Sequence, residues 1–123
     1  MITADPPVAV RLLSFGYAHG RPVPDAHIVL DLRAHFGDSP ESRDPDRLVS
    51  ETDGLPELVE GVIPVLAAYR SGSGSCDGPV VVGVGCADGR LAAAVAATMQ
   101  RQMDNGLVLV TVEHRHEGVP CGP

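Results

Sequence analysis

The sequence predicts a single α/β domain with a four-stranded, mostly parallel sheet and two main helices. The chain has 123 residues, 44% of them hydrophobic, which is enough for one domain with a sizeable core. A continuous β-branched run at 79–84 is typical of a strand covered on both faces. Two segments of helical periodicity separate strand-like segments in the order strand–strand–helix–strand–helix–strand. We expect the domain to span residues 8–116, between tails at 1–7 and 117–123.

The first half of the chain supplies two strands and a long loop. Residues 8–15 form an apolar run that ends at Gly16, and residues 26–34 alternate between apolar and polar side chains. A segment with two prolines and a glycine, residues 20–25, predicts a turn between them. Residues 37–54 show little apolar periodicity, so we expect a long loop there.

The second half alternates helices and strands. Apolar residues recur at spacings of three and four over 55–70, which predicts a helix with Pro56 tolerated in its first turn. Ser and Gly at 71–75 indicate a flexible linker. After the strand at 79–84, residues 85–89 predict a tight loop and 90–103 an alanine-rich helix. Asn105-Gly106 ends that helix, and 107–112 predict the last strand.

Composition excludes several kinds of chemistry. All nine basic residues are Arg, which excludes Schiff-base chemistry, a Lys general base and a P-loop Lys. A net charge of −7 argues against tight, non-specific nucleic-acid binding. Three cysteines without a CxxC pair suit a reducing cytosol, and no apolar run approaches the roughly 18 residues of a membrane span. We therefore expect a cytoplasmic protein that needs no membrane partner.

The most informative local feature is the turn at 83–90, between a predicted strand and a predicted helix. Such a turn directs backbone N–H groups and the positive end of the helix dipole at one point, which is how proteins hold anions. Its GxGxxxG spacing is neither a dinucleotide fingerprint nor a P-loop, and a plain tight turn is the alternative. Asp88 would repel an anion placed over the turn, and Arg90 would attract one.

Cys86 lies in this turn, where a helix N-terminus would favour its thiolate. A cysteine phosphatase loop needs an Arg six positions later, and that position is Ala92. The alternative to a nucleophile is a small, half-buried apolar residue.

Polar residues also follow three other predicted strands, at the sheet edge where open α/β sheets place ligands. Asp31 and Arg33 end the second strand, although a surface ion pair would explain them equally well. His114 and His116 share one side of the last strand, with solvated tail residues as the alternative. After the first strand come Ser14, Tyr17 and His19. No residue order or spacing assigns a catalytic group, a metal site or a cofactor.

Four segments of the chain resemble the C-terminal domain of the RapZ family of RNase adapter proteins. They are SFGYAHGRP at 14–22, HIVLDLR at 27–33, VGVGCADGR at 82–90 and VTVEHR at 110–115. These motifs occur in the family's order and extend over most of residues 11–115. Full-length members also carry an N-terminal kinase-like domain that has no counterpart here, so the chain looks like a free-standing second domain.

The resemblance implies a non-catalytic α/β domain similar to the substrate-binding part of phosphofructokinases. In enteric members this domain senses glucosamine-6-phosphate and contributes to binding a small regulatory RNA, and family members oligomerise. By resemblance, the ligand-binding residues are Gly85, Cys86, Ala87, Gly89, Arg90, Ser14, His19, Asp31, Arg33 and His114.

The chain departs from the family at the groups best suited to phosphate. The family motif reads approximately GCTGGKHRS, whereas residues 85–93 read GCADGRLAA. A Lys that the family usually places after the first strand is Ala18. A lost charged donor costs about 1.5–3 kcal/mol of binding free energy, so these changes would remove most phosphosugar affinity.

These observations lead to a principal hypothesis and three alternatives. The first is a non-catalytic, regulatory domain that binds a small polar or anionic metabolite or a nucleotide. The second is a protein-interaction or oligomerisation module with a vestigial pocket, using the alanine-rich helix at 91–103 or the acidic loop at 38–53. The third is an enzyme using Cys86 or Asp31. The fourth is an RNA-binding adapter, which would need a patch formed by Arg11, Arg21, Arg33, Arg90 and Arg115.

Overall fold

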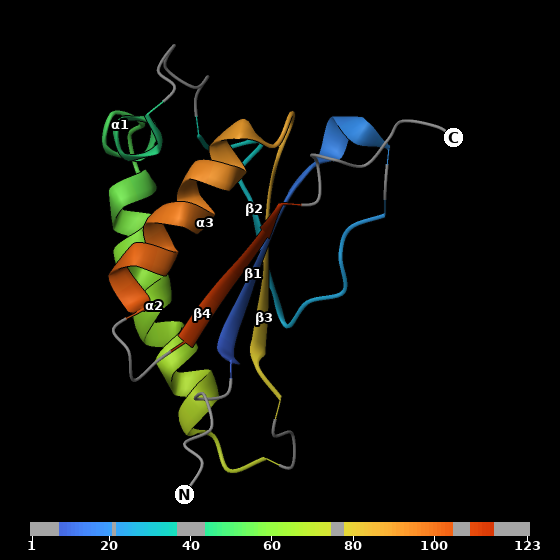
Figure 1. The fold of residues 1–123 in the computed structure, drawn as a ribbon. Helices are drawn as coiled ribbons and strands as arrows, with labels where there is room; N and C mark the ends of the chain where they lie inside the picture. The colour runs from blue at the N-terminus through green and yellow to red at the C-terminus, as the bar shows by residue number, and fades with distance from the viewer. Residues whose placement is uncertain (1–7, 21, 37–43, 75–77, 105–108, 115–123) are drawn as a thin grey trace, which may run out of the picture.

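A computed structural model describes residues 8–20, 22–36, 44–74, 78–104 and 109–114, and it contains one four-stranded sheet. The strands are β1 (Val8–Gly16), β2 (Ile28–Asp31), β3 (Val80–Cys86) and β4 (Leu109–His114). Their order in the sheet is β2-β3-β1-β4, and every neighbouring pair is parallel (Figure 1). The predicted α/β class is confirmed, and the sheet is parallel throughout.

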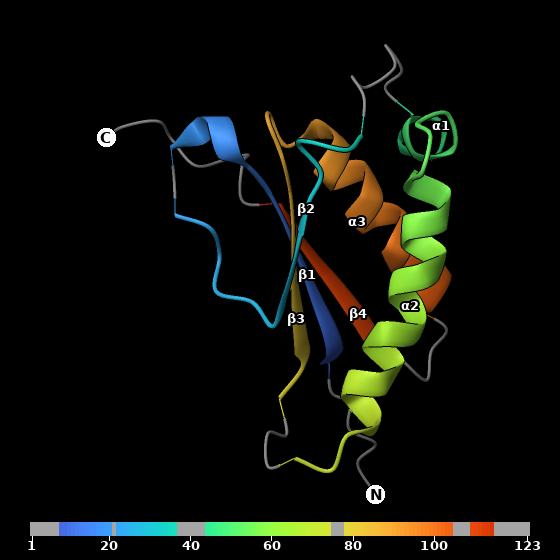
Figure 2. The same cartoon turned by 180° about the vertical axis from the view of Figure 1, so that it is seen from behind.

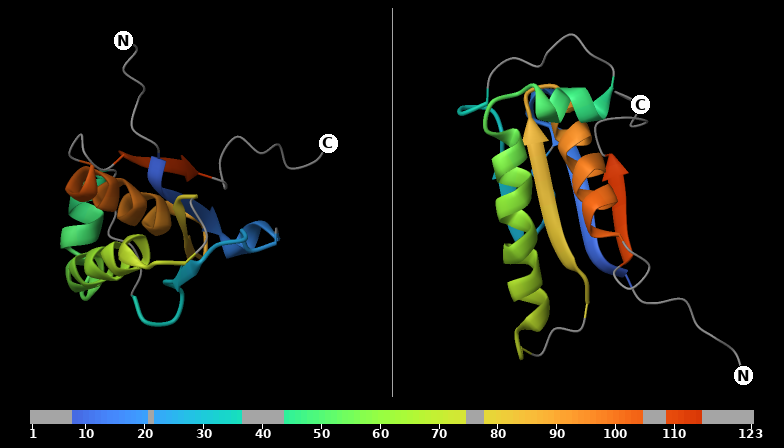
Figure 3. Two further views of the ribbon diagram at one scale, coloured as in Figure 1. Left: turned by 90° about the horizontal axis from the view of Figure 1, so that it is seen from below. Right: turned by 90° about the vertical axis from the view of Figure 1, so that its left-hand side faces the viewer.

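In the described ranges, three α-helices lie on one face of this sheet. They are α1 (Pro45–Ser50), α2 (Leu55–Ser71) and α3 (Arg90–Met103), and Figures 1 and 3 show them on the same side. Apolar side chains from the helices and from alternate strand positions make the core between the two layers. Its fully buried members include Val10, Leu12, Val82, Val84, Leu55, Leu66, Val95 and Met99.

The alanine-rich helix α3 is part of this core. Ala92, Ala94 and Ala96 are all buried, and α3 contacts β1, β3 and β4. Small side chains let the helix approach the sheet closely. These three alanines are therefore covered within the domain, whereas Ala93 and Ala97 of the same helix are only partly buried.

The opposite face of the sheet carries a chain segment in place of helices. Residues 22–27 run along that side, away from the helices (Figure 2). His27 holds the segment to β3 by two hydrogen bonds: its N–H donates to the Val81 carbonyl (2.9 Å), and its Nδ1 accepts from the Val81 N–H (2.9 Å). The 3₁₀ turn η1 (Tyr17–His19) follows β1 on the same side.

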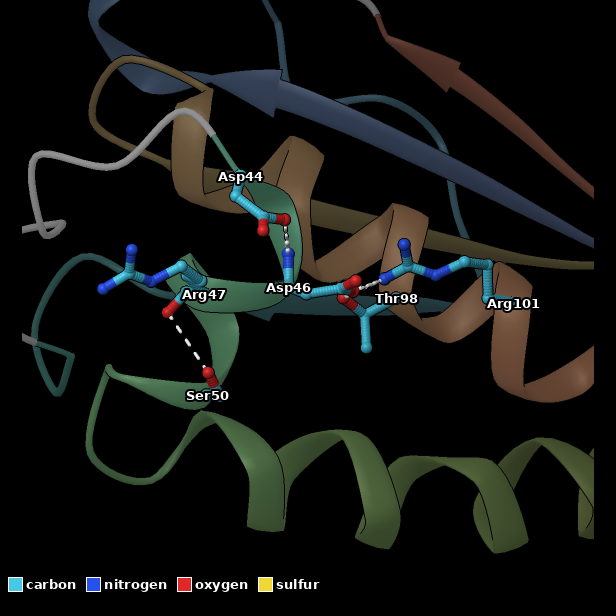
Figure 4. Close-up of polar contacts among 6 residues, drawn as sticks. All are labelled: Asp44, Asp46, Arg47, Ser50, Thr98 and Arg101. Atoms are coloured by element: carbon cyan, nitrogen blue, oxygen red, sulfur yellow. Dashed lines mark hydrogen bonds and ion pairs between the residues drawn. The ribbon is translucent and has the colours of Figure 1, made fainter.

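The predicted loop over 37–54 contains a helix, α1. Asp44 caps it by accepting the Asp46 N–H (3.0 Å), and Pro45 occupies the first turn (Figure 4). Asp46 forms an ion pair with Arg101 of α3. A six-residue helix is too short to show apolar periodicity, which is why the sequence pattern indicates a loop. Residues 37–43 of that prediction lie outside the described residues.

Other element boundaries shift by a few residues. The strand predicted at 26–34 covers only 28–31. At its end the Leu32 N–H still donates to the Gly85 carbonyl of β3 (2.8 Å), whereas the next N–H, that of Arg33, turns back to Asp31 Oδ1 (2.9 Å). The last strand runs from 109 to 114, two residues beyond its predicted end, and 107–108 lie outside the described residues. Helix α2 begins at Leu55 as predicted and ends at Ser71, the first residue of the predicted linker. Within the described ranges, no helix is long and apolar enough to cross a membrane.

Candidate functional site

The carboxyl ends of all four strands meet at one edge of the sheet, and they bring the predicted site residues there. In the strand register Ser14 lies beside His114, Gly16 beside Cys86, and Asp31 beside Gly85. Because side chains alternate across a strand, these residues divide between the two faces of the sheet.

On the helix side, Ser14 and His114 form a hydrogen bond. Ser14 Oγ lies 2.5 Å from His114 Nδ1. Ser14 is 0% exposed, whereas the imidazole is exposed. A nucleophile must be reachable by its substrate, and a fully buried hydroxyl is not. The contact therefore ties β1 to β4 and satisfies a buried hydroxyl group.

Three N–H groups of the β3–α3 turn donate to side chains of the turn itself. The Gly89 and Ala92 N–H groups donate to Cys86 Sγ (3.1 and 3.4 Å), and the Arg90 N–H donates to Asp88 Oδ1 (2.9 Å). Three donors that would face an anion are thus engaged by a thiol and a carboxylate of the same turn. Cys86 is buried, whereas the sequence predicted a half-buried residue. Burial suits a thiol that accepts hydrogen bonds within the turn.

The turn owes its shape to a glycine and to a bond with the neighbouring segment. Gly89 has φ +90°, a backbone conformation that residues with a Cβ rarely adopt. The Ala18 N–H donates to the carbonyl of Ala87 (2.8 Å) and so joins η1 to the turn. Arg90, the first residue of α3, is exposed, and His19 occupies the last position of η1.

On the opposite side of the edge, Tyr17, Asp31 and Arg33 form a compact cluster. Arg33 donates to Asp31 through Nε (3.0 Å to Oδ1) and Nη2 (2.7 Å to Oδ2). The guanidinium carbon also lies 3.4 Å from the centroid of the Tyr17 ring, a cation–π contact. The predicted surface ion pair is therefore present, and it is stacked on an aromatic ring as well.

This cluster rests on an aromatic pair that fills the space above two glycines. The Phe15 and Tyr17 rings meet edge-on, with centroids 5.0 Å apart and planes at 66°. A Cβ on Gly85 would lie 2.5 Å from Phe15 Cζ and 2.7 Å from Tyr17 Cε2. One on Gly83 would lie 3.3 Å from Phe15 Cε1. The glycines at alternate positions of β3 thus make room for the rings.

The charges in this cluster stabilise one another. The bidentate hydrogen bonds from Arg33 lower the pKa of Asp31, and the same pairing raises that of Arg33. Burial raises the pKa of Tyr17, and the nearby Asp31 carboxylate adds to the effect. At neutral pH the cluster therefore holds a charged carboxylate, a charged guanidinium and a neutral phenol.

Two contacts of this site were not predicted from the periodicity and motif spacing of the sequence. The stacking of Arg33 on Tyr17 had one signal, the pair of glycines two residues apart in a buried strand, which indicates a bulky neighbour. The hydrogen bond from the Arg90 N–H to Asp88 Oδ1 had another signal, an Asp two residues before the start of a helix.

A groove of about 230 Å³ lies elsewhere, where α1, α2 and α3 meet. Its apolar lining comes from Val49, Pro56 and Val59, and its polar lining from Asp46, Ser50, Glu60, Thr98 and Gln102. It contains none of the predicted site residues and lies on the helix layer.

Several predicted residues fall outside the described part of the chain. They are Arg21, Arg115, His116, Cys76 and Cys121. Of the proposed RNA patch, Arg11 pairs with Glu113 (3.1 Å) and Arg33 with Asp31, which offsets their charge. Among the described residues, no group of three or more His, Cys, Asp or Glu could hold a metal ion.

The chain was compared with protein-family models and with curated proteins, and neither comparison yields a match.

Proposed function

We propose that this chain is a non-catalytic, RapZ C-terminal-like domain with a regulatory role, which binds a small polar metabolite at the carboxyl edge of its sheet. The observation that carries the proposal is the pairing of two features at that edge. The β3–α3 turn is closed by Cys86 and Asp88, while Asp31 and Arg33 remain exposed beside it. A phosphate would have to displace a carboxylate, whereas a ligand with little negative charge would not.

The proposal excludes a catalytic role for the two nucleophile candidates. Cys86 Sγ already accepts two N–H groups in a buried position, and Ser14 is fully buried. A chemical step at either atom would require the turn or the strand to open.

Calorimetric titration tests the preference against phosphate. Glucosamine-6-phosphate and glucosamine differ only by the phosphate, so we expect the phosphate to add no affinity for the natural chain. The Asp88→Gly variant removes the internal carboxylate and frees the Arg90 N–H. It should bind glucosamine-6-phosphate roughly tenfold to a hundredfold more tightly than the natural chain does.

A charge-matched control is Asp104→Asn, which removes one negative charge from an exposed position at the other end of α3 from the turn. It should leave phosphosugar binding unchanged. Micromolar binding of glucosamine-6-phosphate to the natural chain would contradict the proposed ligand class. The absence of binding to any member of a broad metabolite collection would contradict a binding function altogether.

A second function, protein interaction or self-association, is favoured by the exposed side of α2. Val65 and Tyr69 lie one helical turn apart with 46% and 52% of their surfaces exposed. No charged residue occurs between Glu60 and Arg70. If this surface binds a second copy, sedimentation velocity will show a concentration-dependent dimer that Tyr69→Ser abolishes. A monomer at all concentrations would rule out self-association.

A further inference from the structure

The Arg33 guanidinium presents a flat surface to solvent. One of its faces lies on the Tyr17 ring at 3.4 Å, yet 49% of the Arg33 side chain is exposed. With Tyr17 against one face, the opposite face of the planar group is the one through which a flat ligand could approach. Nη1 donates no hydrogen bond to any described residue, so it too can meet a ligand.

This surface is held in place before any ligand arrives. Two side-chain hydrogen bonds to Asp31 fix the guanidinium plane, and the Arg33 backbone N–H holds the same carboxylate. Beneath it, the Tyr17 ring packs on Phe15, which is itself buried. A ligand that stacks here therefore loses little affinity to ordering the protein side chains.

The ligand chemistry follows from shape and charge. A planar guanidinium stacks well on aromatic rings, and nucleobases are commonly bound between Arg planes and aromatic side chains. The Asp31–Arg33 pair is neutral as a unit, and the chain carries a net charge of −7, so a polyphosphate gains little here. A flat, uncharged ring is the group that this surface fits best.

We propose that the outer face of Arg33 binds the base of a free nucleoside, which stacks on the guanidinium–Tyr17 pair. This inference rests on the proposed binding function and names the ligand class. A purine should bind more tightly than a pyrimidine, because its two fused rings cover more of the guanidinium.

Titration of the full chain with adenosine, uridine and ribose tests the stacking directly. Adenosine should bind most tightly and uridine less tightly, and ribose, which lacks a base, should not bind. Binding of adenosine should also shift the NMR signals of the Tyr17 ring. The Arg33→Lys variant keeps the positive charge but lacks the planar guanidinium. Its affinity for adenosine should therefore fall roughly fivefold to a hundredfold.

Two further variants separate stacking from folding. Tyr17→Phe keeps the ring and should retain adenosine affinity within about twofold. Arg11→Lys alters another exposed Arg of the sheet, one that pairs with Glu113, and should bind like the natural chain. Thermal unfolding of each variant shows whether Arg33→Lys remains folded under the conditions of the titration.

Four outcomes would overturn the inference. Equal adenosine affinity in a folded Arg33→Lys variant would show that the base does not stack on the guanidinium. Ribose binding as tight as adenosine binding would show that the base contributes no affinity. Adenosine shifts confined to the α1–α2–α3 groove would place the site elsewhere. Metabolite binding at this edge without any nucleoside binding would refute the ligand class and leave the proposed function intact.

The same base could also come from single-stranded RNA, which a second arm distinguishes. Oligoadenylate titrated at two salt concentrations should bind no more tightly per base than adenosine does. Tight binding that weakens steeply with salt would show that the phosphate backbone supplies the affinity. The ligand would then be RNA and not a free nucleoside, which would overturn the inference.

Discussion

Adding a methyl group at Gly85 should destabilise the domain more than the same change at Gly83 or Gly61. The new Cβ would lie 2.5 and 2.6 Å from two atoms of the Phe15 ring and 2.7 Å from the Tyr17 ring, whereas ordinary contacts begin near 3.4 Å. The rings must therefore retreat by about an ångström. Phe15 is almost fully buried, and Tyr17 supports Arg33, so neither ring can move alone.

Overpacking of this kind typically costs about 1–3 kcal/mol of unfolding free energy. For a domain of this length, we expect Tm of Gly85→Ala to fall by roughly 5–15 °C. The variant should also lose adenosine affinity, because the displaced Tyr17 ring no longer positions the guanidinium.

Two alanine substitutions serve as controls in the same thermal and urea unfolding experiments. At Gly83 the new Cβ would meet Phe15 Cε1 at 3.3 Å, a contact that a small ring shift relieves, so the loss should stay below about 1 kcal/mol. At Gly61, inside α2, nothing lies within 4 Å, and alanine should raise stability by up to about 1 kcal/mol.

The expected order of stability is Gly61→Ala, natural chain, Gly83→Ala, Gly85→Ala. A Gly85→Ala variant that unfolds at the same temperature as Gly83→Ala would refute the reasoning. It would mean that the aromatic pair does not occupy the space above β3.

Three other predictions follow from single contacts. Replacing Pro64, which lies inside α2 without an N–H, by Ala should raise the unfolding free energy by about 2 kcal/mol in urea titrations, and an unchanged midpoint would contradict this. Asp44→Ala removes the cap of α1 and should cost about 0.5–2 kcal/mol, whereas Asp44→Asn should cost much less; equal losses would show that the cap contributes nothing. Arg33 lowers the pKa of Asp31 in the folded chain below the ordinary value of 3.8. The pairing therefore contributes its full stabilisation above pH 3.8, and this stabilisation is lost as the pH falls through the lower pKa of the folded chain. An NMR titration should place the Asp31 midpoint below 3.8 in the natural chain and at a higher pH in Arg33→Gln, which loses the side-chain hydrogen bonds and keeps the one from the backbone N–H.

The elements with strong patterns were predictable from sequence. The β-branched run of β3 and the spacing of Leu55, Val59, Val62 and Leu66 each reflect a burial pattern that the structure contains. Helix α1 was not predictable from periodicity, because only Leu48 and Val49 of its six residues are buried. Its one local signal was the Asp44-Pro45 pair, a capping residue followed by proline.

The candidate site was predictable in position but not in geometry. Asp31, Arg33 and His114 lie at the carboxyl edge, as the parallel arrangement implies. Which face each side chain takes depends on register between segments far apart in the chain, and local pattern carries no information on that. The stacking of Arg33 on Tyr17 is set in this way, since the rings settle above glycines of β3, more than 60 residues later.

The β3–α3 turn, closed by its own thiol and carboxylate, has an evolutionary consequence. Asp and Gly codons differ by a single base, so one point mutation at position 88 would remove or restore the carboxylate that holds the Arg90 N–H. The thiol of Cys86 would keep its two hydrogen bonds in either state, and the glycine at 89 would keep the turn's shape. A lineage with this frame could therefore pass between closed and anion-accepting turns without rebuilding the fold around them.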